Sequence, residues 1–312
     1  MNKKKIFITG HKGFIANAII QKLKLNNILE ASNKNDYEEV DLEFGYIDLN
    51  NRDNWINLLK NTKCIIHCAG KTNLYKKDKK NSLEIFRKFN TETTKILAQE
   101  AAKLGIKRLI FLSTIGVNGN FTKTTEYFTY KDQPNPSNYY AISKWEAEQE
   151  LLKISNQTGI EIVIIRAPLV YGFGTKGNFM RLIKLINSGL PLPFGLIKNK
   201  RSFIGIDNLV DVVIRCIFND EAKNKTFLVS DGKDLSTPDL INYISSAMQR
   251  SVRLFPFPLP ILSFLSSIVG KSKEINQLTR SLQIDIKYTK KILNWTPSIS
   301  VQEGINRMIK FK

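Results

Sequence analysis

The stretch that decides the fold reads KIFITGHKGFIA and covers residues 5–16. Its first five residues have the composition of a buried strand, and a helical pattern follows the second glycine. Gly10 permits a tight turn, Gly13 lets the backbone approach a pyrophosphate, and Ala16 is small enough for the helix to pack on the strand. The N-terminus of such a helix presents free N–H groups and a partial positive charge. We therefore predict a phosphate-binding turn at the head of the chain.

Strand-length apolar runs alternate with longer amphipathic runs through the first half of the chain. The predicted strands are residues 5–9, 28–32, 64–68, 108–113 and 161–166. Helical spacing is clearest at residues 14–25, 82–104 and 140–158. This alternation is typical of βαβ units, so we predict an α/β fold with a doubly wound parallel sheet of the Rossmann type.

The pattern changes after residue 166, where Gly and Pro become dense up to residue 195. A strand at 202–206, a helix at 208–218 and a strand at 226–230 then follow. We expect the chain to return once to the sheet, so that residues 1–170 and 204–230 form the dinucleotide-binding domain. Residues 171–203 and 231–312 are expected to form a smaller C-terminal α/β lobe that binds the substrate.

The chain carries 47 Lys and Arg against 28 Asp and Glu, a formal net charge of +19. Such a charge can attract nucleic acid, anionic lipid or a phosphorylated small molecule. The lysines are scattered over polar stretches throughout the 312 residues, which is typical of a solvated surface. We therefore expect no nucleic-acid partner.

Three cysteines in apolar surroundings indicate no disulfide framework, and they favour a reducing cytoplasm. Cys64, His67 and Cys68 are interpreted as part of a buried strand rather than as a metal site, because no second ligand pair accompanies them. The first residues lack the apolar core of a signal peptide.

The longest apolar stretch is residues 255–270, which is interrupted by three prolines near its start and is too short to span a membrane. We interpret it as core of the C-terminal lobe and expect no stable membrane insertion. Peripheral membrane contact is the alternative.

The second strand is expected to end near Asn33 and Lys34, where an acidic side chain would bind the ribose 2′-hydroxyl of NAD. No acid stands there, and Asn33 and Lys34 favour the 2′-phosphate of NADP instead. Glu30 or Asp36 could serve NAD if the strand lies in another register. Asp48, with Leu49 beside it, is a candidate for the adenine end or else a turn residue. We expect NADP(H) or NAD(H) as cofactor.

Tyr140 and Lys144 stand four residues apart and hence on one face of a helix. A free tyrosine is a poor base at neutral pH, but a lysine cation and an oxidised nicotinamide both favour its phenolate. Tyr140 can then accept or donate a proton while a hydride moves. Ser113 and Thr114 end the preceding strand at the carboxyl edge of the sheet, where ligands of such folds bind. Thr114 can hydrogen-bond the reacting oxygen.

These residues resemble the extended branch of the short-chain dehydrogenase/reductase family, the nucleotide-sugar epimerases and dehydratases, over nearly the whole chain. The matching motifs are Gly10-x-x-Gly13-x-x-Ala16, His67-Cys68-Ala69-Gly70, Ser113-Thr114, Tyr140-x-x-x-Lys144 and Arg166-x-Pro168-x-x-Tyr171-Gly172. The resemblance implies that Thr114, Tyr140 and Lys144 are catalytic. The residues expected to contact the cofactor are Gly10, Lys12, Gly13, Phe14, Ile15, Asn33, Lys34, Asp48, Leu49, Cys68, Ala69, Gly70, Ser113, Tyr140, Lys144 and Pro168.

A closer resemblance is to the bacterial subgroup around UDP-N-acetylquinovosamine dehydrogenase, a 4-ketoreductase, which is often labelled UDP-glucose 4-epimerase-like. Its motifs lie at residues 168–172, 189–193, 201–203, 229–232, 281–285 and 293–297. The resemblance implies a UDP-sugar substrate, with Asn178 and Arg201 on its pyrophosphate and Thr114 on the sugar. It also implies a homodimer formed through helices of the sheet domain.

The two residues after Thr114 bear on the reaction. The 4,6-dehydratases that the chain resembles carry an Asp-Glu pair there, whereas this sequence has Ile115 and Gly116. Dehydration is therefore not expected, because no side chain is available for the second proton transfer. We expect a 4-ketoreductase of a UDP-4-keto-6-deoxy-N-acetylhexosamine in polysaccharide biosynthesis. The alternatives are a UDP-hexose or UDP-N-acetylhexosamine 4-epimerase, and a non-enzymatic cofactor sensor on the same fold.

Overall fold

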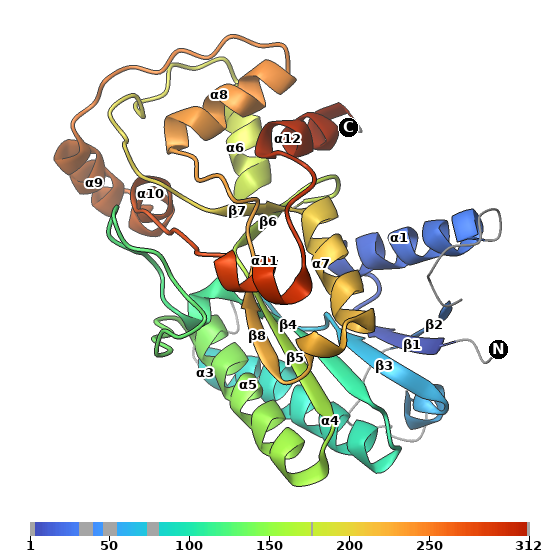
Figure 1. The fold of residues 1–312 in the computed structure, drawn as a ribbon. Coiled ribbons are helices and arrows are strands. Elements are labelled where there is room, and N and C mark those ends of the chain that lie inside the picture. Colours follow the sequence, from blue (N-terminus) through green and yellow to red (C-terminus); the bar gives the residue numbers. More distant parts are fainter. Residues whose placement is uncertain (1–3, 31–39, 46–54, 74–80, 176, 311–312) are drawn as a thin grey trace.

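The computed structural model describes residues 4–30, 40–45, 55–73, 81–175 and 177–310 (Figure 1). Within these residues, parallel strands form a six-stranded sheet in the order β2-β1-β3-β4-β5-β8. The strands are β1 (Lys4–Thr9), β2 (Val40–Gly45), β3 (Thr62–His67), β4 (Arg108–Thr114), β5 (Glu161–Ala167) and β8 (Lys225–Leu228). Because β2 and β3 flank β1 on opposite sides, the chain reverses its winding there, which is where open α/β sheets bind ligands. The predicted doubly wound fold is confirmed.

Helices cover both faces of this sheet (Figure 1). On one face lie α1 (Phe14–Glu30) and α7 (Ile206–Phe218), and on the other lie α4 (Thr93–Lys103) and α5 (Tyr139–Thr158). The chain reaches α4 through α3 (Ser82–Phe86) and the π-helical turn η3 (Arg87–Glu92).

Side chains along each strand alternate between the two cores. Ile6 and Ile8 pack toward α1 and α7, whereas Phe7 packs toward α4 and α5. All three are fully buried, because a strand covered on both faces must be apolar at every position. This double burial explains why the strands read as continuous apolar runs.

The predicted strand at residues 28–32 is wrong for residues 28–30. They continue α1, which runs without a break from Phe14 to Glu30. No Gly or Pro interrupts this stretch, so nothing in the local sequence ends the helix earlier. The edge strand β2 instead covers Val40–Gly45 and pairs with β1.

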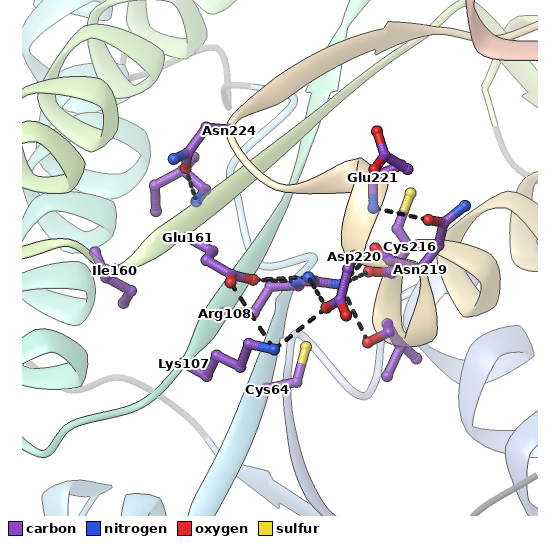
Figure 2. A network of polar contacts seen from close by, with 12 residues as sticks. Cys64, Lys107, Arg108, Ile160, Glu161, Cys216, Asn219, Asp220, Glu221 and Asn224 are labelled. Atoms are coloured by element: carbon purple, nitrogen blue, oxygen red, sulfur yellow. Dashed lines mark hydrogen bonds and ion pairs between the residues drawn. The ribbon is translucent and has the colours of Figure 1, made fainter. Parts of the chain in front are cut away.

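A buried arginine joins the amino ends of the central strands to a helix end (Figure 2). Arg108 at the start of β4 is 3% exposed, and its Nε donates to Glu161 Oε2 over 2.8 Å. Its Nη1 donates to the carbonyl oxygens of Cys216 and Asn219, at the C-terminal end of α7. Helix ends leave such carbonyls without partners, and a cation satisfies them well. This network lies at the opposite sheet edge from the glycine turn and fixes α7 on the sheet.

The remaining elements pack around a second core that holds residues between Tyr171 and Met308. A two-stranded parallel sheet, β6 (Leu169–Tyr171) with β7 (Phe203–Gly205), leads into it. Its helices are α6 (Asn178–Asn187), α8 (Thr237–Ala247), α9 (Leu259–Ile268), α10 (Ser272–Thr279) and α12 (Val301–Lys310). The exception is α11 (Lys287–Leu293), which packs on the core of the sheet domain beside α7 and β8. The short helices η1 (Asn57–Leu59), η4 (Ile115–Val117) and η5 (Asp220–Ala222) complete the described secondary structure.

The interpretation of residues 255–270 as core is wrong for most of that stretch. Only Leu262 and Ser266 of α9 are buried. Several of its large apolar side chains point to solvent. Pro256 and Pro258 precede the helix, which starts at Leu259 with Pro260 in its first turn. It meets the lobe through one narrow face.

Candidate active site

The glycine turn lies where β1 meets the loop after β3. Gly10 has a φ of +72°, and a Cβ at this position would lie 2.8 Å from the backbone nitrogen of Ala69. The N–H of Gly13 donates to the carbonyl oxygen of Gly10 over 2.7 Å, and Ala16 is fully buried. Only glycine fits both the left-handed backbone and the close approach at position 10. The turn thus brings the N-terminus of α1 beside Ala69 and Gly70.

A chain of hydrogen bonds through His67 holds this corner together. Thr9 Oγ1 lies 2.7 Å from His67 Nδ1, and His67 Nε2 lies 2.9 Å from Thr94 Oγ1. Thr94 Oγ1 donates to the carbonyl oxygen of Asn90, and Thr9 Oγ1 accepts from the N–H of Ala69. The donation from Thr94 to Asn90 makes His67 Nε2 a donor, and the hydroxyl of Thr9 can donate to Nδ1 of a neutral imidazole. His67 therefore positions the loop after β3 and does not need to titrate.

We expect His67 to make the protein less stable in acid. Burial, and then the nearby charge of Lys144, lower the pKa of His67 from 6.5 to about 3. Between these two values the unfolded chain binds a proton that the folded protein excludes, so stability falls as the pH falls. The loss from this residue between pH 7 and pH 5 is about 2 kcal/mol.

Urea unfolding of the wild-type protein and of His67→Gln, each at pH 7 and at pH 5, measures the change in unfolding free energy. Glutamine offers one donor and one acceptor but does not titrate, and the carboxylates are common to both proteins. The variant should lose about 2 kcal/mol less than the wild type on acidification. Equal losses would rule out a neutral, buried His67.

Tyr140 and Lys144 lie one turn apart at the start of α5. Asn138 Oδ1 accepts from the N–H of Ala141 over 2.9 Å and so caps this helix end. A Cβ at Gly70 would lie 4.0 Å from Lys144 Nζ. The helix therefore brings Lys144 to the loop that also contacts the glycine turn.

Thr114 reaches the same corner from the end of β4. Its Oγ1 accepts from the N–H of Gly116 over 3.1 Å. A Cβ at Gly116 would lie 3.4 Å from Thr114 Oγ1 and 3.3 Å from the Cβ of Ala141, next to Tyr140. The structure thus brings the three predicted catalytic residues to one edge of the sheet.

Burial shifts the pKa values of Tyr140 and Lys144 in opposite directions. It raises the pKa of Tyr140 to about 12. It lowers the pKa of Lys144 to about 7, although the charges of Glu148 and Cys68 act in the opposite direction. Lys144 Nζ also lies 3.7 Å from the centroid of the Phe111 ring, a cation–π contact. A Tyr140 phenolate at neutral pH consequently needs positive charge close by, from Lys144 and from an oxidised nicotinamide.

Two buried polar residues of this site were missed in the sequence. Asn90 in η3 accepts from the N–H of Lys71 and donates to the hydroxyl of Ser143 and to the carbonyl of Lys71, so it joins the loop after β3 to α5. Glu148 is fully buried one turn beyond Lys144. Polar residues at helical spacing on an otherwise apolar face were the available signal.

Other predicted cofactor residues surround the same edge. Lys12 lies in the turn before α1, Phe14 and Ile15 begin that helix, Cys68 follows β3, and buried Pro168 follows β5. Ser113 donates its hydroxyl to Glu148 Oε1, so a cofactor contact from Ser113 would come from its backbone. Asn33, Lys34, Asp48 and Leu49 lie outside the described residues, as does the alternative Asp36. Glu30 ends α1 rather than a strand.

Asn178 and Arg201, the residues predicted to bind a pyrophosphate, both contact the region of α10. Asn178 starts α6, and its Nδ2 donates to Gln277 Oε1 over 2.5 Å. Arg201 Nη1 donates to the carbonyl oxygen of Arg280 over 3.1 Å. Burial lowers the pKa of Arg201 to about 10. This largely buried cation suits an anionic group of a substrate.

A dinucleotide fits the edge that these residues form. The positive φ and close packing of Gly10 and the adjoining start of α1 are the features that bind a pyrophosphate. In the part of the chain that the structure describes, no group of three or more His, Cys, Asp or Glu residues could hold a metal ion. The arrangement offers one proton donor and acceptor, Tyr140, beside a hydroxyl and a cation.

Comparisons with known proteins identify related enzymes. A family model described as the NAD dependent epimerase/dehydratase family matches residues 6–230. A UDP-glucose 4-epimerase of Vibrio cholerae is 37% identical over 97% of this chain and 94% of its own length. A dTDP-4-dehydro-6-deoxyglucose reductase of Escherichia coli is 23% identical over 99% of this chain and 97% of its own. The solved structure of a UDP-N-acetylglucosamine 4-epimerase from Bacillus cereus shares the fold, with a TM-score of 0.78, 18% identity and 99% coverage of both chains.

Proposed function

The chain belongs to the NAD-dependent epimerase/dehydratase family, and on this premise we propose that it is a UDP-hexose or UDP-N-acetylhexosamine 4-epimerase. The observation that supports the chemistry is the meeting of the glycine turn, Gly70 and Lys144 at one sheet edge. The relative that is 37% identical and named a UDP-glucose 4-epimerase supports the substrate. This order reverses the expectation from the sequence, which put the 4-ketoreductase first.

The chain's own residues handle the proton at C4 of the sugar. A bound nicotinamide dinucleotide would supply the hydride exchange. Tyr140 takes the proton of the C4 hydroxyl when the alcohol is oxidised and returns it when the ketone is reduced. Lys144 stabilises the phenolate of Tyr140, and Thr114 holds the C4 oxygen in line. In an epimerase the 4-keto sugar rotates in the site between oxidation and reduction. The hydride then returns to the opposite face of the C4 carbonyl, and Tyr140 is the proton donor for either product.

The space around Gly116 explains why dehydration is not proposed. A Cβ at this position would lie 3.3 Å from the Cβ of Ala141, so the start of α5 leaves little room for a side chain there. Neither Gly116 nor Ile115 can move a second proton, which elimination of water across C5 and C6 requires. The chemistry is therefore confined to C4.

A 4-ketoreductase of a UDP-4-keto-6-deoxy-N-acetylhexosamine is the second candidate. It is supported by the E. coli relative, a dTDP-4-dehydro-6-deoxyglucose reductase that matches 99% of this chain. Tyr140 would then only donate a proton, and the oxidised cofactor would leave after each turnover.

Stoichiometry separates the two functions. The purified protein is given UDP-N-acetylglucosamine or UDP-glucose with catalytic NAD, and the sugars are identified by NMR. Interconversion of the C4 epimers without net change in reduced cofactor is the expected result. If these sugars are not converted, but NADH or NADPH is consumed in proportion to a UDP-4-keto-6-deoxy sugar, the reductase replaces the epimerase.

A further inference from the structure

One helix of the C-terminal lobe exposes an apolar face. Ile261, Phe264, Leu265 and Ile268 follow helical spacing along α9 and are 48%, 65%, 47% and 66% exposed. We call these four residues the α9 face. The opposite side of the helix, with Leu262 and Ser266, is buried.

This distribution is the reverse of that of an ordinary surface helix. Such a helix buries its apolar stripe and exposes charged residues, whereas α9 has no charged residue in its ten positions. Its Ser263 and Ser267 are the polar residues on the solvent side. Contiguous exposed apolar groups of this kind mark an interaction site rather than a scattered surface.

Further apolar side chains lie on segments linked to α9. Val269, directly after the helix, is 65% exposed, and Phe255, shortly before it, is 38% exposed. The N–H of Gly195 donates to the carbonyl oxygen of Phe255, and Leu196 beside it is 44% exposed. Exposed apolar side chains therefore also occur in the segments before and after the helix.

The segment of sequence that contains α9 is predominantly basic. Residues 240–284 contain five basic residues, Arg250, Arg253, Lys271, Lys273 and Arg280, and one acidic residue, Glu274. Arg250, Arg253 and Lys271 are exposed and flank α9 in the sequence. The chain as a whole carries a formal net charge of +19. The N–H of Lys271 donates to the carbonyl oxygen of Ser266, so this cation lies at the end of α9. An apolar helix with a cation at its end, on a strongly basic chain, is complementary to a bilayer whose apolar interior lies beneath anionic head groups.

We propose that the α9 face docks this protein onto an anionic phospholipid bilayer. The four apolar side chains would enter the boundary between head groups and acyl chains, and the flanking cations would bind the phosphates. Spanning is not involved, because no helix within the described residues combines the length and apolarity needed to cross a bilayer. Figure 1 shows α9 at the periphery of the molecule, beside α10 and away from the six-stranded sheet.

Docking there would bring a membrane surface near the proposed substrate site. The helix after α9 is α10, whose Gln277 contacts Asn178, and Arg280 directly after it contacts Arg201. The membrane would thus lie beside the lobe, and the catalytic edge of the sheet would remain in water. The inference does not rest on the proposed function, since it needs only the surface.

Vesicle flotation tests the proposal directly. The full chain is mixed with vesicles of phosphatidylcholine containing about one quarter phosphatidylglycerol, and with vesicles of phosphatidylcholine alone. We expect flotation with the anionic vesicles, weaker flotation with the neutral ones, and release at high salt. Serine at all four positions of the α9 face should reduce the bound fraction at least roughly tenfold. Glutamine at Arg250, Arg253 and Lys271 should reduce binding to anionic vesicles by roughly fivefold for each charge.

The matched control replaces two equally exposed leucines of the sheet domain, Leu25→Ser and Leu104→Ser, and should float like the wild type. Both serine variants should convert the nucleotide sugar in solution at the wild-type rate.

Failure of the proposed function would remove that turnover but leave flotation unchanged. Wild-type protein that floats with neither vesicle, or an α9 variant that floats normally, overturns the proposal. It is also overturned if the wild type is a dimer in sedimentation velocity and the α9 variant a monomer, since a second copy then covers the face.

Discussion

Replacement of Tyr140 by phenylalanine is expected to lower turnover by about 10²- to 10⁴-fold, the usual contribution of a positioned acid–base group. The phenol is half-buried, and burial alone raises its pKa to about 12. Without its hydroxyl, the site loses the acid–base group that we propose for the reaction. The Tyr140 ring lies 6.1 Å from that of Phe86, a contact that phenylalanine keeps, so the fold and the affinity for the dinucleotide should not change.

Tyr139→Phe is the matched control, because Tyr139 precedes Tyr140 on α5 and is 53% exposed. It should retain wild-type turnover and cofactor affinity, measured by steady-state kinetics and by NADH fluorescence. A Tyr140→Phe protein with unchanged turnover would remove the phenol from the chemistry. A cofactor sensor on the same fold would then become the better interpretation.

The sheet, and the edge at which the candidate site residues meet, could be predicted because their signals are local. Continuous apolar runs of strand length favour buried strands, and helices between them dictate parallel order. The turn at Gly10 and Gly13 can be recognised from a few consecutive residues. The same holds for the spacing of Tyr140 and Lys144. The family resemblance then related these short motifs to one site.

Other features depend on partners that are distant in sequence. Residues 28–30 have strand-like composition, yet they continue α1 because nothing ends the helix before them. The interpretation of residues 255–270 as core failed because apolar composition does not reveal which surface will cover a helix. Asn90 and Glu148 look like ordinary helix residues until the fold places them against β3, β4 and β5.

A buried ion pair behind the catalytic edge ties three elements together. Glu148 of α5 is fully buried and Arg166 of β5 is 5% exposed. Arg166 Nη2 donates to Glu148 Oε2 over 2.6 Å, and Arg166 Nη1 donates to Asn118 Oδ1 over 2.9 Å. Ser113 at the end of β4 donates to the other carboxylate oxygen. The pair therefore fixes α5, and with it Tyr140 and Lys144, relative to the strand that carries Thr114.

Removal of one partner should destabilise the protein far more than removal of both. Glu148→Leu leaves the guanidinium of Arg166 buried without a counter-charge, and Arg166→Leu does the same to the carboxylate. Each single variant is expected to lose about 3–5 kcal/mol of unfolding free energy. The double leucine variant buries no charge and leaves only Ser113 and Asn118 without their partners, so its loss should be smaller than that of either single variant. Urea unfolding of the four proteins measures this coupling directly, and losses that simply add would show that Glu148 and Arg166 contribute independently.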